Sequence, residues 1–272
     1  MFKSLAKAGV GRFPRAAMGY RAVRDEIDNL KASEVSPWGF TLAGSSLMAS
    51  GSFETKETES FRELIQECDL LVNVGANVGY YCCHALSVGV PSIAIEPHPR
   101  NVRMLLRNIA ENGWGKQSHV LPVAAGAESG VLPIFGGGTG ASLLRGWAGT
   151  SGEYAILVPV VPLDDLVSRS VNGMKPLVWV DVEGAELEVL RGAQELLQQT
   201  PRPIWVMEVT LREHQPNQRV NPNFEETFQM FFEAGYSVSA LESRNCKLSM
   251  KDIADIATSG LPDDLGHTFI MR

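Results

Sequence analysis

Hydrophobic positions along this chain fall either into short continuous runs or into runs at helical spacing. The continuous runs predict strands near 70–74, 92–96, 119–124, 177–182 and 203–209, because a strand covered on both faces needs no polar alternation. Apolar residues at helical spacing predict helices near 79–88, 100–112 and 185–199. Strands that alternate with helices in this way predict an α/β fold with a doubly wound, mostly parallel sheet.

Three stretches interrupt this alternation. Residues 1–24 contain six Lys and Arg and no acid, and apolar spacing predicts an amphipathic helix over 14–31. Residues 38–53 are rich in Gly and Ser and predict a hairpin or cap, so residues 1–60 are expected to form a basic helix and cap ahead of a domain at 61–272. Residues 126–150 are rich in glycine and predict either a lid that binds substrate or a loop without chemistry.

The turn after the first strand carries the candidate chemistry. Gly75 and Gly79 enclose Asn77, and Glu96 stands at the end of the next strand. A carboxylate at that place accepts ribose hydroxyls in dinucleotide folds and in enzymes that use S-adenosylmethionine (SAM). The spacing lacks the full G-x-G-x-x-G pattern that seats a pyrophosphate, which favours SAM over a dinucleotide. A tight strand-to-helix connection without a ligand would also select glycine.

A second segment makes the pattern specific. Residues 178–193 read Val-Trp-Val-Asp-Val-Glu-Gly-Ala-Glu-Leu-Glu-Val-Leu-Arg-Gly-Ala, which resembles the signature of the FkbM family of SAM-dependent methyltransferases. The D-V-G-A-N-x-G turn of the family is matched by 73–79, its E-P strand end by 96–97 and its L-D-D-L segment by 163–166. Asn73 stands where the family usually has Asp, so the position brings no charge to the cofactor.

The resemblance implies a Rossmann-like class I methyltransferase fold with seven strands, the last of them antiparallel, and residues 61–272 as the methyltransferase domain. It also implies O-methylation of a hydroxyl of a sugar, glycan or polyketide-like metabolite. The residues expected to bind the cofactor are Asn73, Gly75, Asn77, Gly79, Glu96, Ala124, Ala125 and Asp181.

Acidic residues at two strand ends are the candidates for catalysis. Asp181, Glu183 and Glu208 would form a carboxylate cluster in which one acid is a general base for a hydroxyl, with His214 as an alternative base. The same three acids are the candidate ligands of a divalent metal, although the sequence favours the metal-free version. Ser142 is the candidate contact to substrate.

Composition narrows the partners. The net charge of −7 disfavours a nucleic-acid binder, and no apolar run approaches the ~18 residues of a membrane-spanning helix. Four cysteines without C-x-x-C spacing favour reduced thiols and a cytoplasmic protein. Peripheral membrane contact through residues 1–24 and homo-oligomer formation stay open. Two other functions also stay open, an NAD-dependent oxidoreductase and a non-catalytic SAM-fold scaffold in a glycan assembly.

Overall fold

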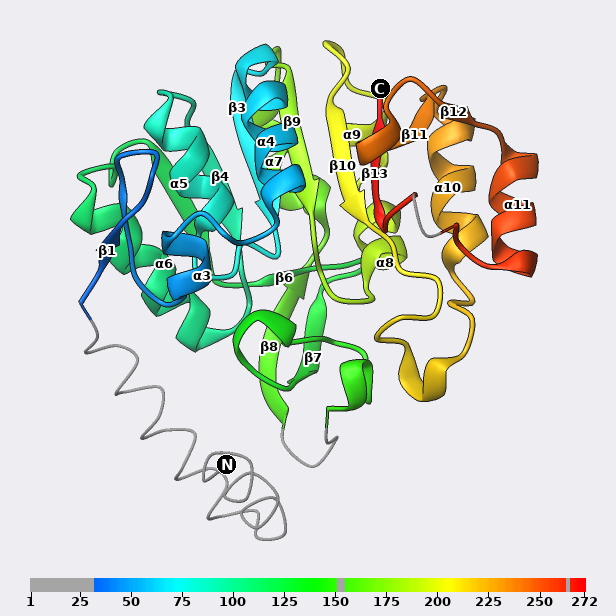
Figure 1. Cartoon of the computed structure of the whole chain (residues 1–272), viewed down its shortest axis with the longest axis horizontal. Coiled ribbons are helices and arrows are strands. Elements are labelled where there is room, and N and C mark those ends of the chain that lie inside the picture. The colour runs from blue at the N-terminus through cyan, green and yellow to red at the C-terminus, as the bar shows by residue number, and fades with distance from the viewer. Residues whose placement is uncertain (1–31, 151–154, 263–264) are drawn as a thin grey trace, which may run out of the picture.

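A large mixed sheet forms the centre of the protein (Figure 1). The computed structural model describes residues 32–150, 155–262 and 265–272, so the expected helix over 14–31 and the basic residues 1–24 lie outside the described residues. The strands of the central sheet are β3 (Leu70–Val74), β4 (Ser92–Ile95), β5 (Ser118–Leu121), β9 (Pro176–Val180), β10 (Ile204–Glu208), β11 (Val238–Ala240), β12 (Lys247–Leu248) and β13 (Thr268–Met271).

The strand order across this sheet is β12-β11-β13-β10-β9-β3-β4-β5. Neighbours from β10 to β5 pair in parallel, whereas β13 pairs antiparallel with both β10 and β11. The predicted α/β class and the antiparallel last strand are therefore confirmed. The number of strands in the described sheet is eight rather than seven, because the two-residue strand β12 pairs with the outer edge of β11.

Helices cover both faces of the sheet because both faces are apolar. Leu71 packs on one core, and Leu70, Val72 and Val74 pack on the other. The helices on the face of Leu71 are α4 (Thr55–Leu64), α5 (Tyr80–Ser87) and α6 (Pro99–Glu111). Those on the opposite face are α7 (Leu163–Val171), α8 (Glu186–Arg191), α9 (Gln194–Leu197), α10 (Phe224–Glu233) and α11 (Met250–Ser259).

The helix predicted over 185–199 is divided into α8 and α9. Gly192 separates them, and a Cβ atom added there would lie 2.1 Å from the carbonyl oxygen of Gly126. The close approach of these two backbones requires glycine, and this contact between distant segments has no local sequence signal.

A second sheet includes part of the loop expected over 126–150, whereas residues 136–150 have no strand. It contains β6 (Ala124–Ala125), β7 (Gly130–Phe135) and β8 (Ala155–Val161) in the order β6-β8-β7. This sheet lies beyond the carboxyl ends of the parallel strands, in the lower part of Figure 1. The segment between β7 and β8 carries a 3₁₀ turn at Trp147–Gly149 and packs against the end of β9.

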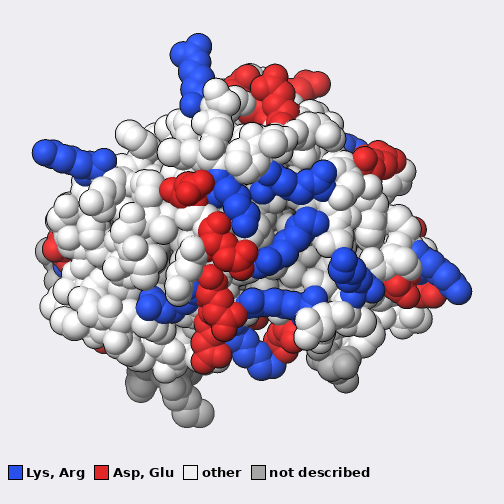
Figure 2. All heavy atoms as spheres, turned by 90° about the horizontal axis from the view of Figure 1, so that it is seen from above, with Lys and Arg blue, Asp and Glu red and all other residues white. Residues whose placement is uncertain are grey.

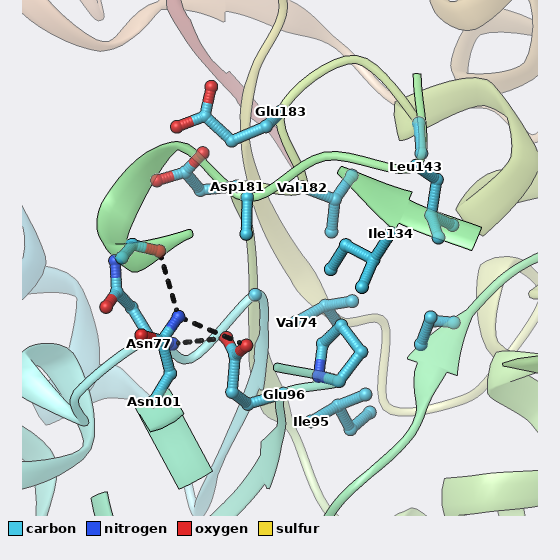
Figure 3. A pocket seen from close by; sticks show the side chains of 17 residues that line it. Val74, Asn77, Ile95, Glu96, Asn101, Ile134, Leu143, Asp181, Val182 and Glu183 are labelled. Carbon is cyan, nitrogen blue, oxygen red and sulfur yellow. Dashed lines mark hydrogen bonds between the residues drawn. The ribbon is translucent and has the colours of Figure 1, made fainter. Parts of the chain in front are cut away.

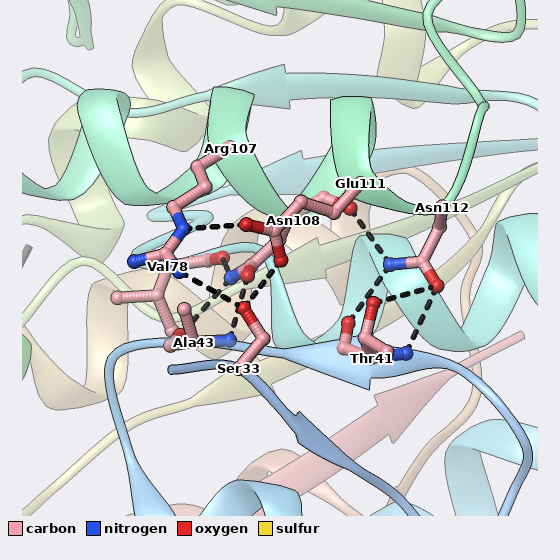
Figure 4. Close-up of polar contacts among 8 residues, drawn as sticks. All are labelled: Ser33, Thr41, Ala43, Val78, Arg107, Asn108, Glu111 and Asn112. Carbon is pink, nitrogen blue, oxygen red and sulfur yellow. Dashed lines mark hydrogen bonds and ion pairs between the residues drawn. The ribbon is translucent and has the colours of Figure 1, made fainter. Parts of the chain in front are cut away.

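Residues before α4 form a small cap on α6. The strands β1 (Glu34–Val35) and β2 (Thr41–Leu42) pair as an antiparallel hairpin, which is followed by α3 (Ser46–Ala49). Asn108 of α6 accepts from the amide of Ala43 at 2.7 Å and donates to the carbonyl of Val78 at 2.8 Å (Figure 4). A hairpin is present in this region, but its first strand lies before the expected range 38–53, and the domain boundary at residue 60 stays a prediction.

Two surface properties complete the fold. Figure 2 shows the end of the molecule opposite the small sheet, where Lys and Arg side chains lie among Asp and Glu side chains. Ion pairs join Glu67 to Arg272 at 2.8 Å and to Lys175 at 3.6 Å. In the part of the chain that the structure describes, no helix has the length and apolar character to cross a membrane.

The four cysteines are free, and three of them are buried. Burial raises the pKa of the Cys82 thiol to about 11. A thiol with such a pKa stays protonated at neutral pH, so Cys82 acts as a small apolar side chain in the core.

Candidate functional site

A pocket lies at the carboxyl ends of β3, β4 and β9, where parallel sheets bind their ligands (Figure 3). Six of the eight predicted cofactor residues line it, and one of the six, Asp181, was also predicted to be catalytic. These residues are Gly75, Asn77, Glu96, Ala124, Ala125 and Asp181. Ile134 and Leu143 from the β7 region form an apolar wall of the same pocket.

The turn after β3 is held tightly against the end of β9. Gly75 has a φ of 83°, and a Cβ atom at this position would lie 1.7 Å from the carbonyl oxygen of Asp181. The amide of Asp181 in turn donates to the carbonyl of Val74 at 3.0 Å. Glycine is required at 75 both for its dihedral angle and for this contact, so the turn places the backbone directly beside Asp181.

Glu96 is 4% exposed and is fixed by three donors. Its carboxylate accepts from the amide of Asn77 at 2.8 Å, the amide of His98 at 2.8 Å and the side chain of Asn101 at 3.3 Å (Figure 3). Burial raises the pKa of Glu96, and the three hydrogen bonds oppose that rise. A carboxylate offers about four acceptor sites, so Glu96 keeps capacity for a further donor.

Two amide oxygens in this pocket are buried without a partner. Asn77 Oδ1 and Asn101 Oδ1 accept no hydrogen bond from the described residues. Asn77 has a φ of 51°, a strained value that the turn imposes. A buried acceptor left unpaired costs free energy, which indicates that a ligand with donor groups completes the site.

The predicted carboxylate cluster is present. The pKa of Asp181 is raised well above its ordinary value, first by burial and then by Glu208 and Glu183. Burial raises the pKa of Glu208 to about 8, with Glu183 and Glu54 as further causes. Figure 3 shows the carboxylates of Asp181 and Glu183 on the same side, away from Ile134. Carboxyl groups with pKa values moved toward neutrality are suited to accept a proton near pH 7.

Glu54 joins this cluster from the segment before α4. The hydroxyl of Tyr81 donates a hydrogen bond to the carboxylate of Glu54 at 2.7 Å. Burial, with smaller contributions from Glu57 and Glu183, raises the pKa of Glu54 to about 7, although the hydrogen bond from Tyr81 opposes the rise. Sequence reasoning missed Glu54, because it lies in the cap region and no local motif marks it.

Trp147 attaches the β7–β8 segment to Glu183. The indole Nε1 donates to the Glu183 carboxylate, and the indole ring packs on Gly184 so closely that a Cβ atom there would lie 2.6 Å away. Ser142 donates to the backbone carbonyl of Glu183 at 2.5 Å. Ser142 is 1% exposed and does not line the pocket, so these contacts give it a positioning role, and its substrate role stays a prediction.

Besides Ser142 and Glu208, three other predicted site residues lie outside the lining of this pocket. Asn73 is 2% exposed and its side chain donates to the Cys82 sulfur at 3.5 Å. Gly79 faces α6, where an added Cβ would lie 2.3 Å from a methyl carbon of Leu105. His214 is exposed, and its ring centre lies 6.0 Å from that of Trp147. His214 also lowers the pKa of Glu183.

Metal binding was tested by the arrangement of the side chains. Among residues 32–150, 155–262 and 265–272, no three His, Cys, Asp or Glu side chains form a group that could hold a metal ion. The charges of Glu183 and Glu208 raise the pKa of Asp181, and the charge of Glu183 raises that of Glu208.

Comparisons with known proteins identify the family. A model of the methyltransferase FkbM domain matches residues 73–238. A hexuronic acid methyltransferase of Haloferax volcanii is 31% identical over 152 residues, which cover 52% of this chain and 58% of that protein. The chain therefore spans less than two thirds of this curated relative.

Two solved structures are similar to this chain at lower identity. An FkbM methyltransferase from Methylobacillus flagellatus has a TM-score of 0.48 at 16% identity, over 75% of this chain and 43% of the other. An O-methyltransferase from Bacillus cereus, solved with SAH, has a TM-score of 0.45 at 14% identity, over 92% of this chain and 86% of the other. Because the family model covers more than half of the sequence, this chain belongs to the FkbM methyltransferase family.

Proposed function

We propose that this protein is a SAM-dependent O-methyltransferase that acts on a hydroxyl of a sugar, glycan or polyketide-like metabolite. The observation that carries the proposal is the pocket beside Asp181, whose lining includes the fixed carboxylate of Glu96 and two asparagines, Asn77 and Asn101, with unpaired amide oxygens. Membership of a methyltransferase family and the hexuronic acid methyltransferase relative support the reaction and the acceptor class.

The residues of the pocket fit SAM in charge and in hydrogen bonding. Glu96 would accept from the ribose hydroxyls, and the free Oδ1 of Asn77 would accept from the amino group of the methionine portion. Ala124, Ala125 and Ile134 line the same pocket and would contact the adenine ring. When bound, SAM supplies a methyl group on a sulfonium, which is an electrophile for an oxygen nucleophile.

The carboxylates beside the pocket would deal with the proton of the acceptor hydroxyl. Asp181 lines both the cofactor pocket and a neighbouring cavity, so it would receive the proton as the oxygen forms its bond to the methyl carbon. Glu208 and Glu183 raise the pKa of Asp181 and thereby make it a stronger base at neutral pH. Trp147 would keep Glu183 in place during this step.

Thermal shift measurements test the cofactor. SAM and its demethylated product are expected to raise the melting temperature, whereas NAD is expected to leave it unchanged. Stabilisation by NAD alone would instead support the oxidoreductase. Turnover is tested with a panel of hydroxylated acceptors, and Asp181→Asn is expected to lower the rate on the order of 10²-fold while SAM still binds. SAM binding without turnover on any acceptor would favour the scaffold.

A further inference from the structure

A second cavity lies on the other side of Asp181. The residues that line it include Glu54, Glu57, Trp179, Asp181, Glu208 and Glu242, and residues 266–268 close it. Asp181 is shared with the cofactor pocket, so the second cavity opens on the place where the methyl group would be transferred. A pocket next to the cofactor and joined to it through a candidate base is where an acceptor hydroxyl has to lie.

Three polar groups that line this cavity have no hydrogen-bond partner among the described residues. The Nδ1 atom of His267 is buried, whereas the carboxylates of Asp181 and Glu208 are open to the cavity. Groups of this kind are paired in folded proteins by protein, water or ligand. Carboxylates accept from hydroxyl groups, so a polyhydroxylated molecule would satisfy several of them together.

The charge of the cavity is one-sided. Five of its residues are acids, and Lys56 is already engaged by Glu242 at 2.6 Å, while the His267 ring contacts Glu213. Glu57, Asp181 and Glu208 form no ion pair with any residue in the described ranges. Mutual repulsion among these acids contributes to the raised pKa of Glu208, in addition to burial.

We propose that this cavity is the acceptor site and that its carboxylates select a neutral or cationic sugar against a hexuronate. The inference rests on the proposed function and narrows its acceptor class. Hydroxyl and ammonium groups would donate to Glu57 and Glu208, and Trp179 would supply an apolar wall for the ring. A uronate carboxylate would meet like charges that no described cation of the cavity balances, and such a juxtaposition is strongly unfavourable.

This selection would separate the protein from its curated relative. The relative from Haloferax volcanii is named a hexuronic acid methyltransferase, and only about half of this chain aligns with it. The segment that matches this relative is 152 residues long. The match to the FkbM domain begins at residue 73, and Glu54, which lines the cavity, lies before it. The acceptor charge is thus set partly by residues that lie outside the shared domain.

Three glycosides that differ only at carbon 6 test the proposal. The probes are methyl α-glucopyranoside, its 6-amino-6-deoxy derivative and the methyl glucuronide, and their binding to the full chain saturated with SAH is measured by saturation-transfer NMR at pH 8. The amino and neutral glycosides are expected to bind at least ~10-fold more tightly than the glucuronide. Glu57→Gln is expected to reduce this ratio, whereas Glu225→Gln, an exposed residue of α10, is expected to leave it unchanged.

The outcomes separate the two proposals. Equal or tighter binding of the glucuronide would overturn the charge selection, and so would a ratio that Glu57→Gln leaves unchanged. If SAH binds and none of the three glycosides does, the cavity is not a sugar site and this inference is wrong, although the cofactor proposal survives. If SAH itself fails to bind a folded protein, the proposed function is wrong.

Discussion

The cofactor pocket and the acid-lined cavity lie on either side of Asp181, and the chain builds them in opposite ways. In the cofactor pocket one acid, Glu96, is satisfied by two backbone amides and one side-chain amide before any ligand binds. In the cavity, Asp181 and Glu208 stand near one another without a donor from the described residues. The cofactor pocket is preorganised for its ligand, whereas the carboxylates of the acid-lined cavity repel one another.

This difference suits the two tasks. A cofactor that binds in every cycle benefits from groups already fixed in their bound positions, because little ordering is then needed. A group that must take up a proton near neutral pH benefits from repulsion, because repulsion raises its pKa toward the working pH. The carboxylate proposed to bind the cofactor, Glu96, is thus hydrogen-bonded by the protein, whereas the carboxylates proposed to act on the proton, Asp181 and Glu208, are not.

The largest effect is expected from a substitution in the turn after β3, which contacts Asp181 between the two regions. Gly75→Ala places a Cβ atom against the carbonyl oxygen of Asp181, a backbone atom that cannot move aside. We expect a loss of more than ~3 kcal/mol in the free energy of unfolding, measured by urea denaturation.

Gly89→Ala is the matched control for this change. Gly89 has a φ of 84°, close to the 83° of Gly75, and an added Cβ there meets nothing within 4 Å. The control is expected to cost only ~1–2 kcal/mol, the penalty of a positive φ. Equal losses in the two variants would contradict the close contact.

The next effect concerns the preorganised acid. Glu96→Ala removes the acceptor of the Asn77 and His98 amides and of the ribose hydroxyls, and SAM binding is expected to weaken by ~2–3 kcal/mol in calorimetry. This corresponds to roughly 30- to 150-fold in Kd. Glu225→Ala should bind SAM like the unaltered protein, and an unchanged Kd in Glu96→Ala would remove Glu96 from the site.

A smaller effect is expected at the contact between Trp147 and Glu183. Trp147→Phe removes the N–H donor that lowers the pKa of Glu183, so this pKa rises. A less charged Glu183 raises the pKa of Asp181 less, and the pH–rate profile of methyl transfer is expected to move toward acidic pH. We expect a rate reduction of ~10-fold at neutral pH, the worth of a hydrogen bond to a charged group.

Trp114→Phe serves as the tryptophan control, since Trp114 lies after α6 and outside both cavities. The control should keep the original profile. If Trp147→Phe also keeps it, the indole has only a packing role.

The smallest effect is on thermal stability. The pKa of Glu208 is about 8 in the folded protein against an ordinary value of 4.5, so the unfolded chain binds fewer protons between these values. The contribution of Glu208 to stability therefore falls as pH rises from about 4.5 to about 8.

Glu208→Gln abolishes this titration. The variant is expected to melt ~2–4 °C above the unaltered protein at pH 8.5, and the difference should disappear near pH 5. Calorimetric melting at the two pH values measures it. A difference that is the same at both values would show that Glu208 is not held in its neutral form by the fold.

Local sequence patterns determined the arrangement of the elements. The apolar run 70–74 and the acid at 96 belong to one strand–helix–strand unit of a parallel sheet, and the fold of such a unit brings the turn and the acid together. The faces of α6 were less well determined. Leu105 and Ile109 are buried as the spacing predicts, whereas Leu106 is 50% exposed, because a contact face is narrower than the run of apolar residues.

Only the tertiary structure decided which carboxylates share a site and which lose contact with water. Glu54 and Trp147 reach Asp181 and Glu183 from segments that are distant in sequence, and packing rather than local periodicity places them there. Packing also removed Asn73 and Gly79 from the pocket lining, toward Cys82 and α6. Burial and the distance between charges are properties of the folded chain, so the raised pKa values of Glu54 and Glu208 could not be predicted from the order of the residues.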